Sequence, residues 1–180
     1  MASQDFAAES GAFQAHAYDQ PEVMAGQGTL AREVEQQTDV DVILCAVGGG
    51  GLIGGIASWF RERARVVAVE PAQCPTFSKA LEAGHPVEVE VSGVAASSLG
   101  ARSVGRYPWR ARDWIDDSVL VDDDDIVEAQ RWIWAETKLA VEPAAAVPVA
   151  ALRTGSFRPA PGSRVVVVLS GGNVHPGSVV

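Results

Sequence analysis

Three short apolar runs constrain the fold of this 180-residue chain more than any other feature. They occupy residues 41–47, 65–70 and 164–169, and each has the length of a single strand. Nearly continuous apolar strands are typical of a parallel sheet whose two faces are both covered by helices. Segments with helical patterns separate the runs, and such alternation indicates an α/β fold. We therefore predict one α/β domain with a mostly parallel sheet and helices on both faces.

The remaining elements are predicted from helix start and stop signals and from the spacing of apolar residues. An alternation with Glu88 and Glu90 indicates an edge strand with one wet face at residues 87–91. The aspartates at 122–125 are expected to cap the helix that follows, because a calcium loop would need alternating ligands, a glycine and a distal glutamate. Other short strands are predicted at 12–17 and 118–121, and helices at 4–10, 21–37, 52–63, 76–83, 126–138 and 143–152.

Charge and composition narrow the range of partners. The formal net charge of −9 argues against nucleic acid, because a nucleic-acid binder normally presents a basic face. No apolar run approaches the ~20 residues that span a bilayer, so we expect no membrane partner. Cys45 and Cys74 form no spaced framework, which makes a reduced, cytoplasmic setting the simpler expectation.

The first apolar run leads directly into four consecutive glycines, Gly48 to Gly51, and then into Leu52. Such a loop permits positive φ, removes side chains between backbone and ligand, and lets successive N–H groups form an anion nest. The N-terminus of the following helix adds its dipole, so a phosphate is the expected ligand. The same run also matches G-x-G-x-x-G, with Glu70 about 20 residues on, which leaves an NAD-binding module as an alternative.

The last apolar run ends in a second cluster, Ser170-Gly171-Gly172-Asn173. A hydroxyl at the tip of a buried strand is placed to contact a ligand, because ligands of α/β sheets bind outside the carboxyl ends of strands. A turn in which Ser170 only caps the backbone is the alternative.

Taken together, the motifs resemble the fold-type-II pyridoxal-phosphate enzymes of the tryptophan synthase beta-like superfamily. Within them the similarity is to serine/threonine dehydratases and serine racemases. The motifs occur in the family's order and cover nearly the whole chain. They are Tyr18-Asp19-Gln20-Pro21, Gly26-Gln27-Gly28-Thr29, Val47-Gly48-Gly49-Gly50-Gly51-Leu52, Val69-Glu70-Pro71, Val141-Glu142-Pro143 and Leu169-Ser170-Gly171-Gly172-Asn173.

The resemblance implies the cofactor pyridoxal 5′-phosphate (PLP), a small amino-acid substrate and a homodimer in the full-length form. It implies that the serine of the second cluster, Ser170, contacts the pyridine nitrogen. A neutral hydroxyl leaves that nitrogen largely unprotonated, which suits ammonia-lyase chemistry on serine- or threonine-type hydroxy amino acids. Racemases share these motifs, so the two activities are not separated. The implied cofactor-phosphate ligands are Gly48, Gly49, Gly50, Gly51 and Leu52.

The family's Schiff-base lysine lies upstream of the glycine loop, in a part that this sequence does not match. Only Lys79 and Lys138 are present, and both follow the loop. We therefore expect residues 1–18 to be the tail of a smaller domain and residues 19–180 to be the C-terminal portion of the large PLP-binding domain. The lysine-bearing N-terminal half would then be missing or would be a separate chain. A catalytically silent PLP- or phosphate-binding remnant is the alternative.

Some family members bind a divalent cation through the glutamate of the V-E-P motif, a backbone carbonyl and an aspartate. The resemblance assigns the glutamate to Glu70 and the carbonyl to Cys74, whereas Thr76 stands in the place of the aspartate. Loss of a carboxylate weakens a site for a hard cation. Ser97 likewise stands where relatives often have an acid. The alternative to cation binding is a purely structural role for Glu70 at the end of its strand.

Overall fold

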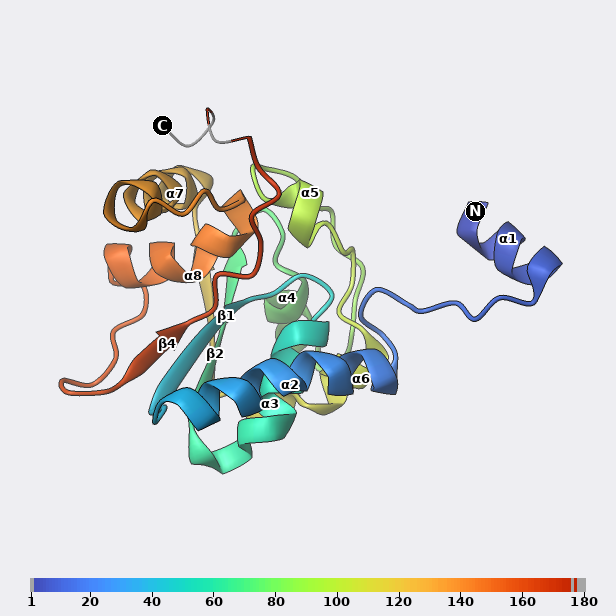
Figure 1. Ribbon diagram of the computed structural model, residues 1–180, viewed down its shortest axis with the longest axis horizontal. Coiled ribbons are helices and arrows are strands. Elements are labelled where there is room, and N and C mark those ends of the chain that lie inside the picture. The colour runs from blue at the N-terminus through green and yellow to red at the C-terminus, as the bar shows by residue number, and fades with distance from the viewer. Residues whose placement is uncertain (1, 176, 178–180) are drawn as a thin grey trace.

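A four-stranded parallel sheet lies at the centre of the computed structural model, which describes residues 2–175 and 177 (Figure 1). The strands run in the order β3-β2-β1-β4, and every neighbouring pair is parallel. The predicted α/β class with a parallel sheet is confirmed. The strands are β1 (Val42–Ala46), β2 (Arg65–Pro71), β3 (Asp117–Val121) and β4 (Val165–Val167).

Helices cover both faces of this sheet (Figure 1). Along β1, Leu44 packs with α7 and α8, whereas Ile43 and Cys45 pack with α2, α3 and α4 on the opposite face. None of the described helices is long and apolar enough to cross a lipid bilayer. The helices are α1 (Ala2–Ser10), α2 (Pro21–Gln37), α3 (Gly51–Phe60), α4 (Thr76–Ala83), α5 (Ala96–Leu99), α6 (Arg106–Arg110), α7 (Asp123–Thr137) and α8 (Pro143–Thr154), with 3₁₀ turns at Arg61–Arg63 and Arg112–Trp114.

The order of the strands reverses between β1 and β4. The chain adds β2 and then β3 on one side of β1, and β4 afterwards returns to the other side. In open α/β sheets such a reversal leaves a crevice outside the carboxyl ends of the two strands, where ligands bind. The glycine loop follows β1 and the second cluster follows β4, so both leave the sheet at this crevice.

Two of the predicted strands are wrong. Residues 12–17 form no strand, because they lead from α1 to α2 away from the sheet and have no neighbouring strand there (Figure 1). Residues 87–91 form no strand either. The Val89 N–H donates to the carbonyl of Arg102 at 2.8 Å, but Arg102 lies in a loop and not in a neighbouring strand. The predicted strand at 164–169 shortens to Val165–Val167 and is half-exposed, since it lies at the edge of the sheet.

The helix after the aspartate run begins at Asp123, close to its predicted start. Asp122 is the extended residue before the helix, but its side chain makes no capping hydrogen bond. The Asp123 carboxylate instead accepts the N–H of Val94 at 3.0 Å. Side-chain capping by Asp122 is therefore not observed, and the first-turn acids act through the helix dipole. The division between residues 18 and 19 into two domains stays a prediction.

Candidate functional site

The glycine loop joins the buried strand β1 to helix α3 and presents free N–H groups. Gly50 has φ of 87°, a left-handed conformation that favours glycine, and it is the N-cap residue directly before α3. Within the part of the chain that the structure describes, no hydrogen bond is donated by the N–H groups of residues 48–53. Free N–H groups at a helix N-terminus, together with the helix dipole, form an anion site without any cationic side chain.

The carbonyl groups of the loop are held, unlike its N–H groups. The Gly48 carbonyl accepts the hydroxyl of Thr76 at 2.6 Å, and the Gly49 carbonyl accepts the N–H of Gly105 at 3.0 Å. The Gly50 carbonyl accepts the N–H of Gly54 at 2.8 Å, as the first bond of α3. The loop is therefore anchored through its acceptors while its donors stay available for a ligand.

Close packing behind the loop leaves no room for side chains. A Cβ at Gly49 would overlap the ring of Tyr18, and a Cβ at Gly51 would lie 2.9 Å from the Cβ of Tyr18. A Cβ at Gly50 would lie 2.9 Å from the Cβ of Pro108. Real Cβ atoms do not approach neighbours this closely, so the loop conformation requires glycine at these positions.

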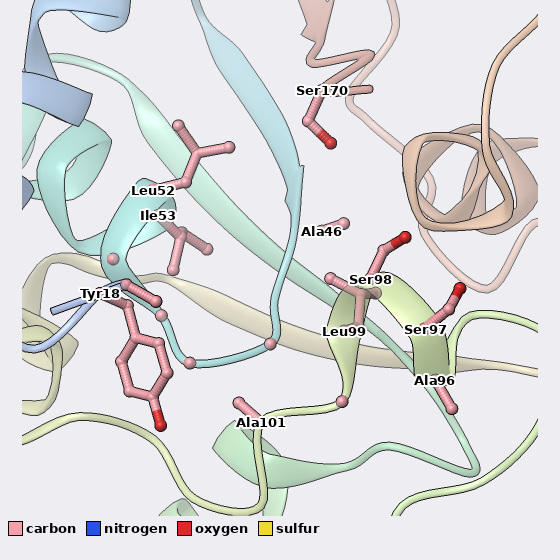
Figure 2. Close-up of a pocket in the computed structure, with 16 residues that line it drawn as sticks. Tyr18, Ala46, Leu52, Ile53, Ala96, Ser97, Ser98, Leu99, Ala101 and Ser170 are labelled. Carbon is pink, nitrogen blue, oxygen red and sulfur yellow. The ribbon is translucent and has the colours of Figure 1, made fainter. Parts of the chain in front are cut away.

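A cavity of about 480 Å³ brings the two glycine clusters together (Figure 2). One wall is the glycine loop with Tyr18, and another is the segment 96–101 around α5. Ser170 enters from the end of β4, and Figure 2 shows its hydroxyl directed into the cavity opposite that of Ser98. Ser170 is exposed, so the cavity is open on that side. Both clusters therefore line one cavity at the carboxyl ends of β1 and β4.

The segment that carries Ser170 packs against the start of α8. The N–H of Glu142 donates to the carbonyl of Gly171 at 3.1 Å. The Glu142 carboxylate lies so close to Gly171 that a Cβ there would overlap it. The motifs Val141-Glu142-Pro143 and Ser170-Gly171-Gly172-Asn173 are thus in direct contact, and that contact requires glycine at position 171.

Glu70 is fully buried beneath the glycine loop and ties β2 to α4. Its carboxylate accepts the N–H of Phe77 (2.7 Å), the N–H of Ser78 (2.8 Å) and the Ser78 hydroxyl (2.6 Å). The Thr76 hydroxyl lies 3.1 Å from the same carboxylate. Burial raises the pKa of Glu70, and the hydrogen bonds from Ser78 and from the Phe77 N–H oppose that rise. This carboxylate therefore has a structural role at the start of α4.

The divalent-cation site stays a prediction. No group of three or more His, Cys, Asp or Glu side chains close enough to hold a metal ion occurs among the described residues. Thr76, which stands in the place of the expected aspartate, instead donates its proton to Gly48. Through Thr76, the residues around Glu70 support the glycine loop.

Two residues of the site have roles that the sequence did not reveal. Tyr18 forms the surface on which the loop rests, and its hydroxyl contacts the carbonyl of Ser103 at 3.3 Å. The Asp19 carboxylate accepts the N–H of Tyr107 at 2.8 Å and so holds α6, which was not predicted. Both lie in the motif that ends at Pro21, but these contacts are to residues far along the chain.

Neither lysine lies at the cavity. Lys79 pairs with Glu82 on the exposed surface of α4, at 2.7 Å. Lys138 directly follows α7, and its Nζ donates to the carbonyl of Ala135 at 2.7 Å.

Ser97, which stands where relatives often have an acid, lines the cavity.

The fold and site define an α/β protein with a glycine loop of unpaired N–H groups and a strand-end hydroxyl at the reversal of its sheet. Residues 1–171 match the pyridoxal-phosphate dependent enzymes, and the chain belongs to this family. The family resemblance predicted from the motifs is confirmed.

Its relatives include both threonine dehydratases and serine racemases. The chain is 42% identical to L-threonine ammonia-lyase of Geobacter sulfurreducens over 92% of its own length and 42% of the relative. It is 35% identical to serine racemase of Arabidopsis thaliana, over 95% of this chain and 54% of that one. The solved structure of maize serine racemase matches with a TM-score of 0.89 and 30% identity, covering 99% of this chain and 56% of the other. The chain thus spans about half the length of these relatives.

Proposed function

We propose that this chain is the phosphate-binding portion of a PLP-dependent ammonia-lyase that acts on serine- or threonine-type hydroxy amino acids. The observation that carries the proposal is the shared cavity of about 480 Å³, which the free N–H groups of the glycine loop and the Ser170 hydroxyl both reach. The relative named L-threonine ammonia-lyase supports the reaction type.

The residues present fit a phosphorylated ring. The N–H groups of Gly48, Gly49, Gly50, Gly51 and Leu52 would hold the phosphate, because they are unpaired and lie at the N-terminus of α3. When bound, PLP supplies the electron sink for a carbanion next to the substrate's amino group. The Ser170 hydroxyl would donate to the ring nitrogen without keeping it protonated, which favours loss of a β-hydroxyl over return of a proton.

The lysine amine that this chemistry needs is proposed to come from outside these 180 residues. A nucleophilic lysine must reach the cavity, with its pKa lowered by burial or by a neighbouring cation. Lys79 is instead paired with Glu82, and Lys138 is exposed at the end of α7. We therefore expect the isolated chain to bind PLP through its phosphate but to have no ammonia-lyase activity.

Binding is tested with the ¹⁵N-labelled chain, titrated first with inorganic phosphate and then with PLP. The amide signals of Gly48–Gly51 are expected to shift with both ligands. Those of Gly84 and Gly162, which do not line the cavity, serve as internal controls. Unchanged loop signals would remove the phosphate site from the proposal. Saturable shifts with NAD alone would favour the dinucleotide module instead.

Turnover is tested after adding the part of the Geobacter relative that precedes the matched segment. Keto-acid formation from serine or threonine is expected. Racemisation without keto acid would favour the activity named for the Arabidopsis relative. If the two parts formed a complex that bound PLP but produced no keto acid, the result would support a catalytically silent PLP-binding remnant.

A further inference from the structure

A second pocket lies between α2, α3 and α6, and it is separate from the cavity that the glycine loop lines. Its volume is about 400 Å³, and it shares no lining residue with that cavity. The three helices are in mutual contact on one face of the sheet (Figure 1). A pocket of this size accommodates a small organic molecule. The reaction proposed above makes no use of it.

Two glycines form the base of this pocket, because they let α2 and α3 touch backbone to backbone. A Cβ at Gly28 would lie 3.0 Å from the carbonyl oxygen of Gly55, and a Cβ at Gly55 would lie 2.6 Å from the nitrogen of Gly28. Both glycines line the pocket. Met24 and Arg32 stand four residues before and after Gly28, so they lie on the same face of α2 and flank the pocket.

The walls of the pocket are mostly apolar. Met24, Trp59 and Tyr107 line it, and all three side chains are half-buried. Methionine adapts to irregular shapes and packs well against rings, whereas indole and phenol rings offer flat apolar surfaces. The Trp59 ring is held in place, because its Nε1 donates to the Glu35 carboxylate at 2.9 Å. These walls favour a ligand with an apolar body of about the size of a ring.

The charged side chain that lines the pocket is a cation, Arg32. Its guanidinium is exposed and forms no hydrogen bond or ion pair with any residue that the structure describes. The Glu35 carboxylate, one turn further along α2, is already engaged by Arg63 and Trp59. No aspartate or glutamate lines the pocket, although the chain has a net charge of −9. The pocket therefore favours an anionic group in an otherwise acidic protein.

Two hydroxyl groups add uncommitted polar atoms to the same pocket. Ser58 and Tyr107 line it, and neither hydroxyl forms a hydrogen bond with a described residue. The Tyr107 backbone is fixed through its N–H bond to the Asp19 carboxylate. Arg106 and Arg110 stack on the Tyr107 ring, with guanidinium carbons 4.9 and 5.3 Å from its centroid, and add positive charge nearby. A carboxylate can accept hydrogen bonds from a guanidinium and from hydroxyl groups.

We propose that this pocket binds a small monocarboxylate with an apolar body, whose carboxylate accepts hydrogen bonds from Arg32 while the body packs between Met24 and Trp59. A guanidinium binds a carboxylate with two parallel hydrogen bonds, and the single arginine of the lining matches a single negative charge. A phosphate ester would carry further charge, for which the lining offers no second cation. The site is separate from the proposed cofactor site, so it does not rest on the proposed function.

The test titrates the ¹⁵N-labelled chain with 3-phenylpropanoate and needs no cofactor. The amide signals of Gly28 and Gly55 are expected to shift in a saturable manner, with a Kd of about 1 mM, which is typical of a ligand of this size. The signals of Gly48–Gly51 should stay unchanged, which separates this site from the phosphate site. The neutral 3-phenylpropanamide, and acetate, which lacks the apolar body, should each bind about tenfold more weakly or worse.

Three variants locate the contact. Arg32→Gln removes the cation at an exposed position and should weaken binding of 3-phenylpropanoate by about tenfold. Arg131→Gln is the matched control, because Arg131 is also exposed on a helix and has no ion pair among the described residues, so affinity should stay unchanged. Ala25→Phe places a ring at an exposed position of the lining and should abolish binding, while the amide spectrum shows that the fold is kept.

Equal affinities for 3-phenylpropanoate and its amide, or equal affinities of the Arg32→Gln and Arg131→Gln variants, would overturn the proposal. Binding that Ala25→Phe leaves unchanged would place the ligand elsewhere and overturn it as well. The same holds if the signals of Gly28 and Gly55 do not shift, or if inorganic phosphate shifts them as strongly as 3-phenylpropanoate does.

Discussion

The hydroxyl of Thr76 donates a 2.6 Å hydrogen bond to the carbonyl oxygen of Gly48, so the first turn of α4 holds the first residue of the glycine loop. Thr76 is fully buried and also lies 3.1 Å from the Glu70 carboxylate. The position of a loop that follows β1 therefore depends on side chains from β2 and α4. Thr76 therefore links the Glu70 carboxylate to the glycine loop.

Replacement Thr76→Val tests this support. The variant keeps the shape of the side chain but leaves the partly buried Gly48 carbonyl without its donor, so we expect a loss of about 1–3 kcal/mol in the free energy of unfolding. Phosphate affinity should also fall, because the loop loses its anchor. Thr29→Val removes an exposed hydroxyl that donates to the Gly26 carbonyl and should change neither quantity measurably. Urea denaturation and phosphate titration measure the two effects; equal behaviour of the variants would contradict this assignment.

Replacement Gly50→Ala tests the tight packing of the loop. Gly50 (φ 87°) and Gly84 (φ 77°) share a left-handed conformation, which costs about 1–2 kcal/mol for an alanine. Only at Gly50 would the new Cβ lie within 3 Å of neighbours, at 2.9 Å from Pro108 and Val104, whereas Gly84 has open space. Gly50→Ala should therefore lose phosphate binding and more stability than Gly84→Ala, which should keep binding. If both variants lost similar amounts of unfolding free energy and of phosphate affinity, a steric requirement for glycine at position 50 would be contradicted.

Replacement Ser170→Asp tests the partner of the ring nitrogen in the complemented enzyme. A carboxylate would keep that nitrogen protonated and strengthen the electron sink, so the ratio of elimination to racemisation should fall. Ser98→Asp places the same charge on the opposite wall of the cavity and should affect affinity without changing the ratio. Product analysis by chiral chromatography measures the ratio. A ratio that Ser170→Asp leaves unchanged would show that the hydroxyl does not face the ring.

The ion pair of Asp41 and Arg164 predicts a pH dependence of stability. Hydrogen bonds from the Arg164 side chain lower the pKa of Asp41 from 3.8 to about 2. The unfolded chain therefore binds this proton at a higher pH than the folded one, so the contribution is complete above pH 4 and disappears as the pH falls through about 2. The difference in unfolding midpoint between the native chain and Asp41→Asn should shrink over this range, and added salt should reduce it, because both side chains are largely exposed. A difference independent of pH would contradict the pairing.

The two cysteines should be unreactive in the folded protein. Burial raises the pKa of the Cys45 thiol to about 12 and also raises that of Cys74. Since the thiolate is the reactive form, neither should react with a thiol reagent near pH 8 until the chain unfolds. The exposed variant Ser10→Cys should react promptly under the same conditions. Rapid labelling of two thiols in the native chain would contradict the described burial.

Local signals in the sequence predicted two helices to the residue. Helix α2 spans Pro21–Gln37 and α4 spans Thr76–Ala83, as expected. Proline in the first turn and glycine after the last turn act through their own backbone conformation, and Gly84 does adopt positive φ. The predicted strands at 12–17 and 87–91 failed because alternation of side chains does not reveal whether a neighbouring strand is present to complete the hydrogen bonds.

The sequence by itself determined the α/β class, the family and the two clusters that flank the cavity, because apolar runs and glycine-rich strand ends are local patterns. Only the tertiary structure decided that β4 returns to the far side of β1, which brings Ser170 to the glycine loop. It also decided that Tyr18 lies behind Gly49, that the Thr76 hydroxyl bonds to the Gly48 carbonyl, and that β4 lies at the edge of the described sheet. These features depend on contacts between segments far apart in the chain, and no local pattern of residues encodes which segments meet.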